Sequence, residues 1–224
     1  MDQIAYYFFN FSLMSGHWPA IGASFLITVE MAALTILIGI PLGLALAVLR
    51  LYGIRPLNWL IIFYIDFFRS IPQLVIIVLV FFALPYLDLV ISAFWATVLA
   101  LSFVLSAFAE EVFWASITAV PAGQWEAGRS SGLGFNQTLG HIILPQAVRM
   151  SIPPLTNRAI GITKGTALGS VIAVPELLNV TQSIQSNVAN PTALTVATVL
   201  FLVLFLPLVL FTRWIEFRYR HAGR

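Results

Sequence analysis

The segment Glu126–Pro145 reads EAGRSSGLGFNQTLGHIILP and is a polar, glycine-punctuated interruption between long apolar stretches. The rest of the chain is suited to hydrocarbon, because 60% of the 224 residues are hydrophobic and only 9% are charged. A soluble domain of this length would expose far more charge, so the composition indicates an integral membrane protein. We therefore expect the polar segment to lie outside the bilayer, as a docking loop for a partner.

Several apolar stretches on either side of this segment are long enough to cross roughly 30 Å of hydrocarbon. They lie at about residues 21–49, 57–84, 91–118, 147–174 and 191–215. The sequence thus predicts an all-α integral membrane protein with five transmembrane helices, forming a single domain over residues 1–224. An odd number of spans places the two termini on opposite sides of the membrane.

The charges predict the orientation of these spans. Arginines follow the first span, flank the loop between the third and fourth, and follow the fifth: Arg50, Arg55, Arg129, Arg149, Arg213, Arg218, Arg220 and Arg224. The opposite side carries Asp2, Asp88 and Glu176 and no lysine or arginine. The positive-inside rule then places the N-terminus outside, and the C-terminus and the loop at residues 119–145 in the cytoplasm.

The first 19 residues are rich in aromatic side chains but too short and too polar to cross a membrane: Tyr6, Tyr7, Phe8, Phe9, Phe11 and Trp18. This pattern is typical of an interfacial helix, here on the outer surface, and a frayed aromatic tail is the alternative. The first residues lack the basic region of a cleavable signal peptide, so we expect insertion to depend on the spans themselves.

The loop at residues 119–145 has the residues to form two short helices. Pro121 is suited to begin the first, with polar groups near its positive end at Gln124 and Glu126. Gly132 and Gly134 are expected to interrupt it, since glycine tolerates the left-handed geometry of a helix end. A second helix would run over residues 136–143, and Pro145 would lead into the fourth span. From these residues alone, the loop is either a connector lying on the membrane or a unit that fits a partner's groove.

A family resemblance favours the second possibility. Glu126-Ala127, Gly132, and then Ile142, Leu144 and Pro145 resemble the EAA motif of ABC importer permeases. The flanking sequences AVPAGQ (119–124) and LPQAVR (144–149) resemble the polar amino-acid branch of that family, of the histidine and glutamine type. DFFRSIP (66–72) resembles the acidic-x-x-Arg-x-x-Pro element of the same branch. The resemblance covers essentially the whole chain and implies the fold of a type I ABC importer permease.

In that family the loop forms coupling helices that sit in a groove of a cytoplasmic ATPase. The resemblance therefore implies that a set of loop residues couples ATP hydrolysis to transport: Gln124, Glu126, Ala127, Gly128 and Gly132. The implied partners are ABC ATPase subunits, a second permease (the same chain or a related one) and an extracytoplasmic substrate-binding protein, in a bacterial inner membrane. The chain lacks a phosphate-binding loop, so we expect no cofactor here, no enzymatic activity, and ATP and Mg²⁺ bound by the ATPase.

The sequence departs from the family pattern at three places. Gly128 replaces the usual alanine of the motif, a change expected to cost the helix about 1 kcal/mol. Glu111 is followed by Trp114-Ala115, where the family often has an Arg-Gly pair. Lys164-Gly165-Thr166 replaces a Lys-Asp-Ser/Thr element. The substrate preference of relatives therefore does not carry over directly.

Several charged residues lie within the spans or near their ends: Glu30, Asp66, Arg69, Glu110, Glu111, Arg158 and Lys164. An unpaired charge in the membrane is costly, so each should face protein, water or an opposite charge. Asp66 and Arg69 are three residues apart and share a helix face, which predicts a structural ion pair. Arg69 is also a candidate for the substrate pathway. Glu110 and Glu111 are expected to point in different directions.

Lys164 lies deep in the fourth span, among glycines that recur at every fourth position: Gly161, Gly165 and Gly169. That spacing allows close helix approach and favours packing against a second permease. The functional alternative is that Lys164, Thr163 and Thr166 line the substrate pathway, with Lys164 binding a carboxylate. Glu30 could then meet the ammonium group of a zwitterionic substrate.

The sequence lacks the residues that several other classes of protein require. The chain has no cysteine, and its histidines (His17, His141 and His221) are scattered, so no metal site is predicted. No basic stripe for nucleic acid and no nucleophile elbow is present. An ion-coupled secondary carrier using Glu30, Glu110 and Lys164 is the alternative function, and an intramembrane enzyme is a third. The transported amino acid or derivative, and the choice between homodimer and heterodimer, stay open.

Overall fold

The computed structural model describes residues 2–222, with the side chains of residues 2, 215, 216 and 218–222 left aside. This part of the chain folds into helices and contains no strand. The helices are α1 (Asp2–Phe8), α2 (Trp18–Arg50), α3 (Arg55–Ser70), α4 (Gln73–Ala83), α5 (Ala93–Thr118), α6 (Ala122–Ser130), α7 (Phe135–Thr138), α8 (Leu144–Thr163), α9 (Leu177–Val188) and α10 (Thr192–Ala222). The 3₁₀ segments are η1 (Phe11–Met14), η2 (Leu84–Leu87) and η4 (Lys164–Ile172), and η3 (Leu139–Ile143) is a π-helical turn.

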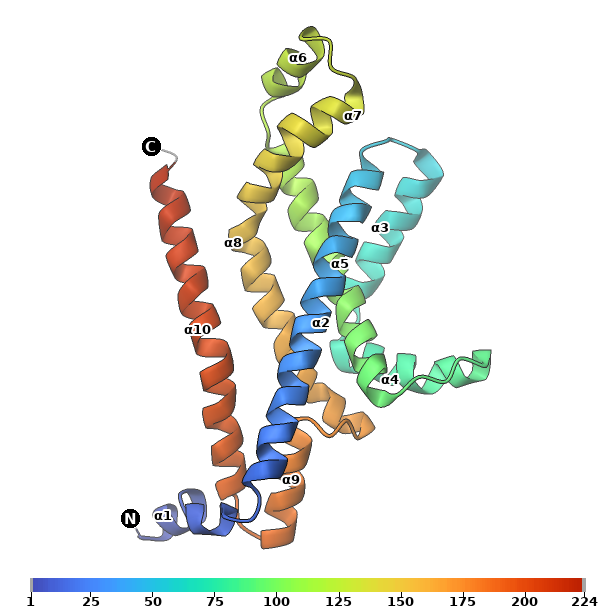
Figure 1. Ribbon diagram of the computed structural model, residues 1–224. Coiled ribbons are helices and arrows are strands. Elements are labelled where there is room, and N and C mark those ends of the chain that lie inside the picture. The colour runs from blue at the N-terminus through green and yellow to red at the C-terminus, as the bar shows by residue number, and fades with distance from the viewer. Residues whose placement is uncertain (1, 223–224) are drawn as a thin grey trace.

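Within the described residues, α2, α5 and α10 are each long and apolar enough to cross a membrane alone. Two further bent pairs, α3 with α4–η2 and α7–η4 with α9, raise the number of possible spans to five. In Figure 1 α2 and α10 extend over most of the length of the molecule, with α6 and α7 at one end and α1 and α9 at the other, whereas α3 lies only in the part nearer α6 and α7. The end that carries α6 and α7 is called the loop end below. The five expected spans are thus present if each bent pair counts as one.

The second span is not the continuous helix expected at residues 57–84. Its two halves, α3 and α4, meet at an angle of 109°, and α4 extends sideways from the bundle (Figure 1). The break lies at Ile71 and Pro72, where Ile71 is extended with φ −96° and ψ 134°. The ring of a proline disfavours helical geometry in the residue before it, which explains why α3 ends at this point.

The fourth span also changes its geometry part-way. The α-helix α8 gives way to η4, a 3₁₀ segment of nine residues, and the chain then turns at Ala173 with φ 60°. Runs of 3₁₀ helix longer than three or four residues are uncommon, and they often mark strain or a functional hinge. The expected span at 147–174 is therefore helical as far as Ile172, and it is wound more tightly from Lys164 onward.

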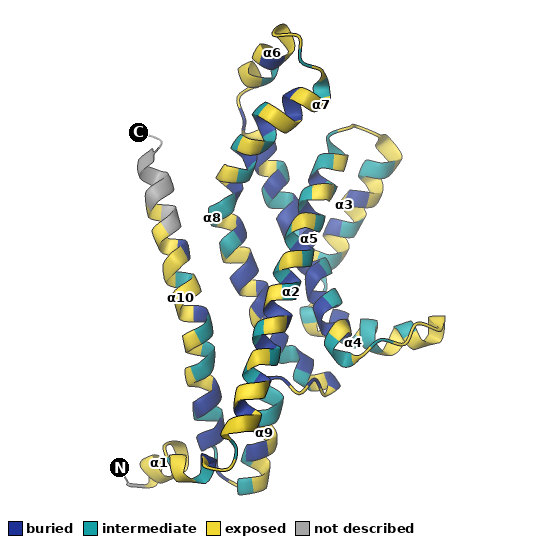
Figure 2. Ribbon diagram, in the orientation of Figure 1, coloured by how far each residue is buried: buried dark blue, intermediate teal, exposed yellow. Residues whose placement is uncertain are grey.

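The core forms around α5, which packs against α2, α3, α4 and α8. In the apolar 18-residue stretch of each helix, 67% of the residues of α5 are buried, against 17% of those of α10. The helix α5 is therefore central and α10 peripheral (Figure 2). Small residues let α2 approach α5 closely. A Cβ at Gly39 would lie 2.9 Å from Leu105 Cβ, and one at Gly43 would lie 2.6 Å from Ala109 Cβ. Glycine at both positions therefore allows the backbones to come together.

The glycines of the fourth span mostly pack within this chain, not against a second permease as expected. A Cβ at Gly165 would meet the side chains of Gln73 and Leu101, and one at Gly169 would meet Thr97 and Val174. Of these three glycines of the fourth span, only Gly161 has no atom of the described structure, apart from neighbouring atoms of its own helix, within 4 Å of where its Cβ would lie. The spacing correctly indicates close approach, but the partners of Gly165 and Gly169 are α4 and α5 of the same chain.

The aromatic N-terminal segment is held against the corner between α9 and α10. Thr192 Oγ1 accepts a hydrogen bond from the Asn10 N–H at 3.1 Å and donates one to the Tyr7 carbonyl at 3.2 Å. Asn190 Nδ2 donates to the Tyr6 carbonyl at 3.2 Å. The segment is helical and anchored, with its aromatic side chains exposed, which favours the interfacial helix over the frayed tail.

Candidate functional site

The loop segment forms two helices joined by a glycine turn, as the sequence predicts. Pro121 caps α6, which ends in a Schellman motif with Gly132 at φ +84°. In this motif the Leu133 N–H donates to the Gly128 carbonyl at 3.2 Å, and the Gly132 N–H donates to the Arg129 carbonyl at 3.0 Å. Gly134 differs from the expectation, because its φ of −66° is not left-handed and it begins the next helix.

The second helix of the loop is not a separate element. It begins as α7, passes through the π-helical turn Leu139–Ile143 and continues directly into α8. Gln137 Oε1 accepts a hydrogen bond from the Gly134 N–H at 2.9 Å and closes the first turn. The expected helix over residues 136–143 is therefore the first part of the fourth span, and any displacement of α7 is passed along one continuous helix.

The two helices of the loop are packed tightly at Gly128. This residue is buried, and a Cβ there would lie 2.7 Å from Thr138 Cγ2 and 2.9 Å from Ile142 Cδ1. Trp125 stacks on Phe135 with ring centroids 5.5 Å apart. Glycine in place of the usual alanine thus allows α6 to lie directly on the helix that follows it.

The loop is also connected to the turn between α2 and α3. The Tyr52 hydroxyl donates a hydrogen bond to Asn136 Oδ1 at 3.1 Å, and the Tyr52 ring lies edge-on to Phe135 at 5.8 Å. The loop therefore contacts two parts of the bundle, α8 by continuity and the α2–α3 turn by packing.

The residues predicted to couple to an ATPase are divided between the surface and the interior of the loop. Gln124, Glu126, Ala127 and Gly132 are exposed, whereas Gly128 is buried between the helices. The exposed face of α6 lies at the tip of the loop end (Figure 2). Its geometry leaves this face accessible to a protein that approaches from that end.

The charges near the loop end form two ion pairs that connect different helices. Arg50 Nη1 lies 3.1 Å from Glu110 Oε1, and Arg69 Nη1 lies 2.9 Å from Glu111 Oε1. The predicted pairing of Asp66 with Arg69 is wrong, because the Arg69 side chain reaches across from α3 to α5. Glu110 and Glu111 do point in different directions, since the Glu110 side chain has no exposed surface and that of Glu111 is 45% exposed.

These charges surround a cavity of about 220 Å³, which we call the charged cavity. It is lined by Arg50, Ile62, Ile65, Asp66, Arg69, Glu110, Glu111 and Trp114. The Arg50 guanidinium lies 4.2 Å from the centroid of the Trp114 ring. Within the described structure, the buried Glu110 Oε2 has no hydrogen-bond partner.

The fold and the loop can be compared with known proteins. Residues 39–221 match the family model described as the binding-protein-dependent transport system inner membrane component. The chain belongs to this family. The chain is similar to the L-cystine transport system permease protein TcyB of Bacillus subtilis, with 38% identity over 75% of this chain and 71% of TcyB. The arginine ABC transporter permease protein ArtQ of Haemophilus influenzae is 31% identical over 89% of this chain and 93% of ArtQ.

Solved structures agree with this assignment. A permease chain from the crystal structure of an amino acid ABC transporter with histidines superposes with a TM-score of 0.83 and 30% identity, covering 93% of this chain and 98% of that one. A chain of the inward-facing MetNI methionine ABC transporter, 22% identical with a TM-score of 0.63 over 91% of this chain and 93% of that one, shows the same fold. The protein is thus a multi-pass ABC permease of the type I fold.

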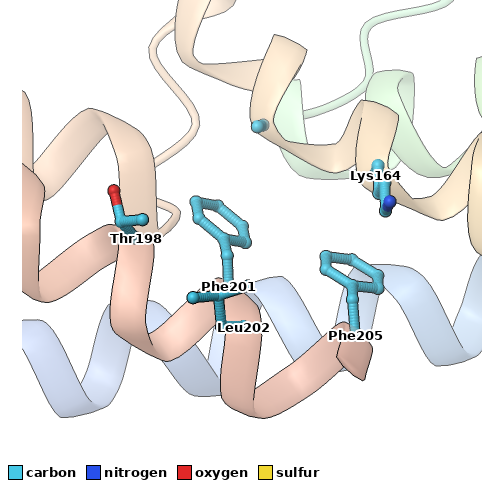
Figure 3. A pocket seen from close by; sticks show the side chains of 6 residues that line it. Lys164, Thr198, Phe201, Leu202 and Phe205 are labelled. Atoms are coloured by element: carbon cyan, nitrogen blue, oxygen red, sulfur yellow. The ribbon is translucent and has the colours of Figure 1, made fainter. Parts of the chain in front are cut away.

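The substrate-pathway candidates of this permease are not gathered into one site. Lys164 lines a cavity of about 340 Å³ between η4 and α10, together with Ala167, Thr198, Phe201, Leu202 and Phe205. Figure 3 shows the lysine side chain near Phe205, and Nζ lies 5.8 Å from that ring's centroid. No ion pair within the described structure joins Lys164 to Glu30, which is exposed on α2.

The two threonines beside Lys164 differ in their hydrogen bonding. The buried Thr163 hydroxyl donates to the Ala159 carbonyl at 2.8 Å, so its own helix satisfies it. Thr166 is equally buried, but its hydroxyl has no partner in the described part of the chain. Thr166 therefore keeps hydrogen-bonding capacity that Thr163 has already used.

The structure also identifies features that the sequence reasoning missed. The Arg50–Glu110 pair was not predicted, although Arg50 ends one span and Glu110 lies two turns before the end of another on the same side. The close approach of α2 to α5 at Gly39 and Gly43 was also missed. Its signal was present in the regular four-residue spacing of buried Thr35, Gly39, Gly43 and Ala47 along α2.

Proposed function

We propose that this chain is the transmembrane permease subunit of an ATP-driven importer for polar amino acids or related compounds. It would form half of the translocation pathway. The observation that carries the proposal is the exposed α6 helix at the tip of a bundle that superposes on an amino-acid ABC transporter. Relatives named for cystine, glutamine and arginine transport support small polar substrates.

We place the loop end on the cytoplasmic side of a bacterial inner membrane. The exposed Arg55, Arg129 and Arg149 lie at this end, as does Arg50, and Arg213 lies near it on α10. The opposite end carries the α1 segment, α9 and Glu176. This distribution agrees with the positive-inside rule and leaves the aromatic residues of α1 at the outer interface.

The coupling mechanism follows from the way the loop is packed. A cytoplasmic ATPase subunit would receive α6 in a groove, with Gln124, Glu126, Ala127 and Gly132 at the contact. Closure of a pair of ATPase subunits on ATP would displace α6. Because α6 packs on the helix that continues into α8, the displacement would reach the membrane and switch the pathway from inward-facing to outward-facing. Hydrolysis would reset it.

The other partners are a second permease, the same chain or a related one, and a soluble protein that delivers substrate outside. The unequal charges in the membrane favour a heterodimer. Lys164 is the best candidate for a substrate carboxylate, because it is the charged residue in the lining of its cavity and the hydroxyl of Thr166, two residues on, has no partner in the described part of the chain. The Lys164→Glu variant should assemble but lose uptake, and normal uptake would remove Lys164 from the pathway.

The test of the proposed function is purification of the tagged chain from its native membrane in gentle detergent, with the accompanying chains identified. An ATPase should be retained by the wild type and lost with Glu126→Lys. Asn187→Lys is the control, because it places the same lysine side chain at an exposed position on α9 at the opposite end. A chain that purifies alone and transports in vesicles without ATP would refute the proposal in favour of an ion-coupled carrier.

A further inference from the structure

The charged cavity has an imbalance of charge. Its lining includes two arginines, Arg50 and Arg69, and three carboxylates, Asp66, Glu110 and Glu111, which sums to one excess negative charge. Each arginine is paired with one glutamate of α5. Asp66, which is exposed on α3, has no ion-pair partner among the described residues.

A second observation shows that the cavity is short of a donor. Glu110 has no exposed side-chain surface, its Oε1 faces Arg50, and its Oε2 has no partner in the described structure. A buried carboxylate with one oxygen unsatisfied is costly unless a cation or a proton completes it. Glu110 and the unpaired Asp66 line the same cavity.

The sequence explains why this chain supplies no third cation at the cavity itself. Trp114 lines the cavity with an uncharged ring, whose centroid lies 4.2 Å from the Arg50 guanidinium. Arg158 is a further cation on α8, and its guanidinium lies 4.9 Å from the centroid of the Phe108 ring. Arg158 does not line the cavity.

We propose that the charged cavity is a binding site for one monovalent cationic group, completed by Asp66 and Glu110. Two sources have this chemistry: the ammonium or guanidinium end of a transported amino acid, and an alkali-metal ion. The first rests on the proposed function and makes this permease suited to basic amino acids. A volume of about 220 Å³ is several times the roughly 30 Å³ that a water molecule occupies in the liquid, so an organic cation fits.

Three variants test the site. Asp66→Asn removes the excess charge without breaking either ion pair. Trp114→Arg supplies the missing cation from within the chain and should occupy the site. Asp88→Asn is the matched control, because it makes the same chemical change at an exposed carboxylate outside the cavity.

The first measurement is the thermal unfolding of the purified permease complex with L-arginine, L-lysine, or the neutral analogue L-citrulline. We expect a stabilising shift with the two cationic amino acids only, and a roughly tenfold weaker apparent affinity in Asp66→Asn, equivalent to 1.4 kcal/mol. Trp114→Arg should show the same loss, and Asp88→Asn should match the wild type.

A second arm distinguishes the alkali-metal source. The wild type is titrated with sodium or potassium chloride against N-methylglucamine chloride. A shift specific to the small ions and lost in Asp66→Asn supports the site with an inorganic occupant. No shift with any cationic probe, or equal shifts in wild type and Asp66→Asn, overturns the proposal.

ATP-driven uptake in proteoliposomes keeps the two proposals separate. Uptake of neutral amino acids that persists while cation binding is absent overturns the site and leaves the importer intact. Cation binding without any ATP-driven uptake supports the site and refutes the importer.

Discussion

Replacement of Gly128 by alanine is the sharpest test of how the loop is built. Alanine gains about 1 kcal/mol of helix propensity over glycine in a helix interior. Its Cβ, however, would lie 2.7 Å from Thr138 Cγ2, 3.0 Å from Thr138 Oγ1 and 2.9 Å from Ile142 Cδ1. Thr138 is fully buried and β-branched, so its side chain cannot easily rotate away. Overpacking of this kind typically costs about 1–3 kcal/mol, so we expect a net loss of up to about 2 kcal/mol.

Two further variants make this prediction specific to the contact. Gly123→Ala changes the same residue type in the same helix, but its Cβ would meet no atom within 4 Å, so it should be neutral or slightly stabilising. Thr138→Ala removes two of the three close contacts and a buried hydroxyl that has no partner among the described residues. The double variant Gly128→Ala/Thr138→Ala should therefore recover most of the loss.

The assay is thermal unfolding of the purified complex, with ATPase retention and ATP hydrolysed per substrate transported measured in parallel. At about 2–4 °C per kcal/mol for a chain of this size, Gly128→Ala should lower Tm by several degrees. It should also weaken the coupling of ATP hydrolysis to transport, because α6 would be displaced from its packing against Thr138 and Ile142. The reasoning is refuted if Gly128→Ala behaves like Gly123→Ala, or if Thr138→Ala fails to rescue it.

Three further outcomes are expected. Thr192→Val removes both hydrogen bonds of this side chain to the N-terminal segment, at roughly 1–3 kcal/mol, so chymotrypsin should cleave that segment faster than in the wild type. Arg69→Gln should lower the free energy of unfolding by less than about 1 kcal/mol, because the side chains of Arg69 and its partner Glu111 are 33% and 45% exposed. A double-mutant cycle measures the coupling between the two. Glu176→Ala removes a carboxylate that accepts hydrogen bonds from two backbone N–H groups at the start of α9. The free energy of local opening there, measured by hydrogen exchange, should fall by about 1–2 kcal/mol.

The continuous spans were predictable because a membrane imposes a simple rule. A helix satisfies its own backbone hydrogen bonds, so a long apolar stretch in lipid must be helical. The stretches expected at residues 21–49 and 91–118 match α2 and α5 to within three residues at each end. The break at Pro72 was not predicted, because a proline within an apolar stretch can kink a membrane helix without ending it. The proline explains why α3 ends, but the direction of α4 depends on its packing against α5 and η4.

The side-chain partners were less predictable, for a related reason. Spacing along one helix identifies residues that share a face, as it did for Asp66 and Arg69, but not the residues that another helix brings to that face. Arg69 has a longer reach than the three-residue spacing requires, and α5 offers it Glu111 instead. The same limit applies to Gly165 and Gly169, whose spacing indicates close packing without saying which helix provides the contact.

The loop and the charged cavity are mechanically connected through the turn between α2 and α3. Arg50 ends α2 and lines the cavity, and Tyr52, two residues later, contacts Phe135 and Asn136 of the loop. A displacement of α7 would therefore act on Tyr52 as well as on α8, and we expect it to shift Arg50 relative to Glu110 on the buried α5. Because that ion pair borders the unpartnered oxygen of Glu110, a movement of the loop would alter the charge balance of the cavity. Tyr52→Phe keeps the ring contact but loses the hydrogen bond to Asn136, so it should weaken this connection while leaving α6 and its exposed face in place.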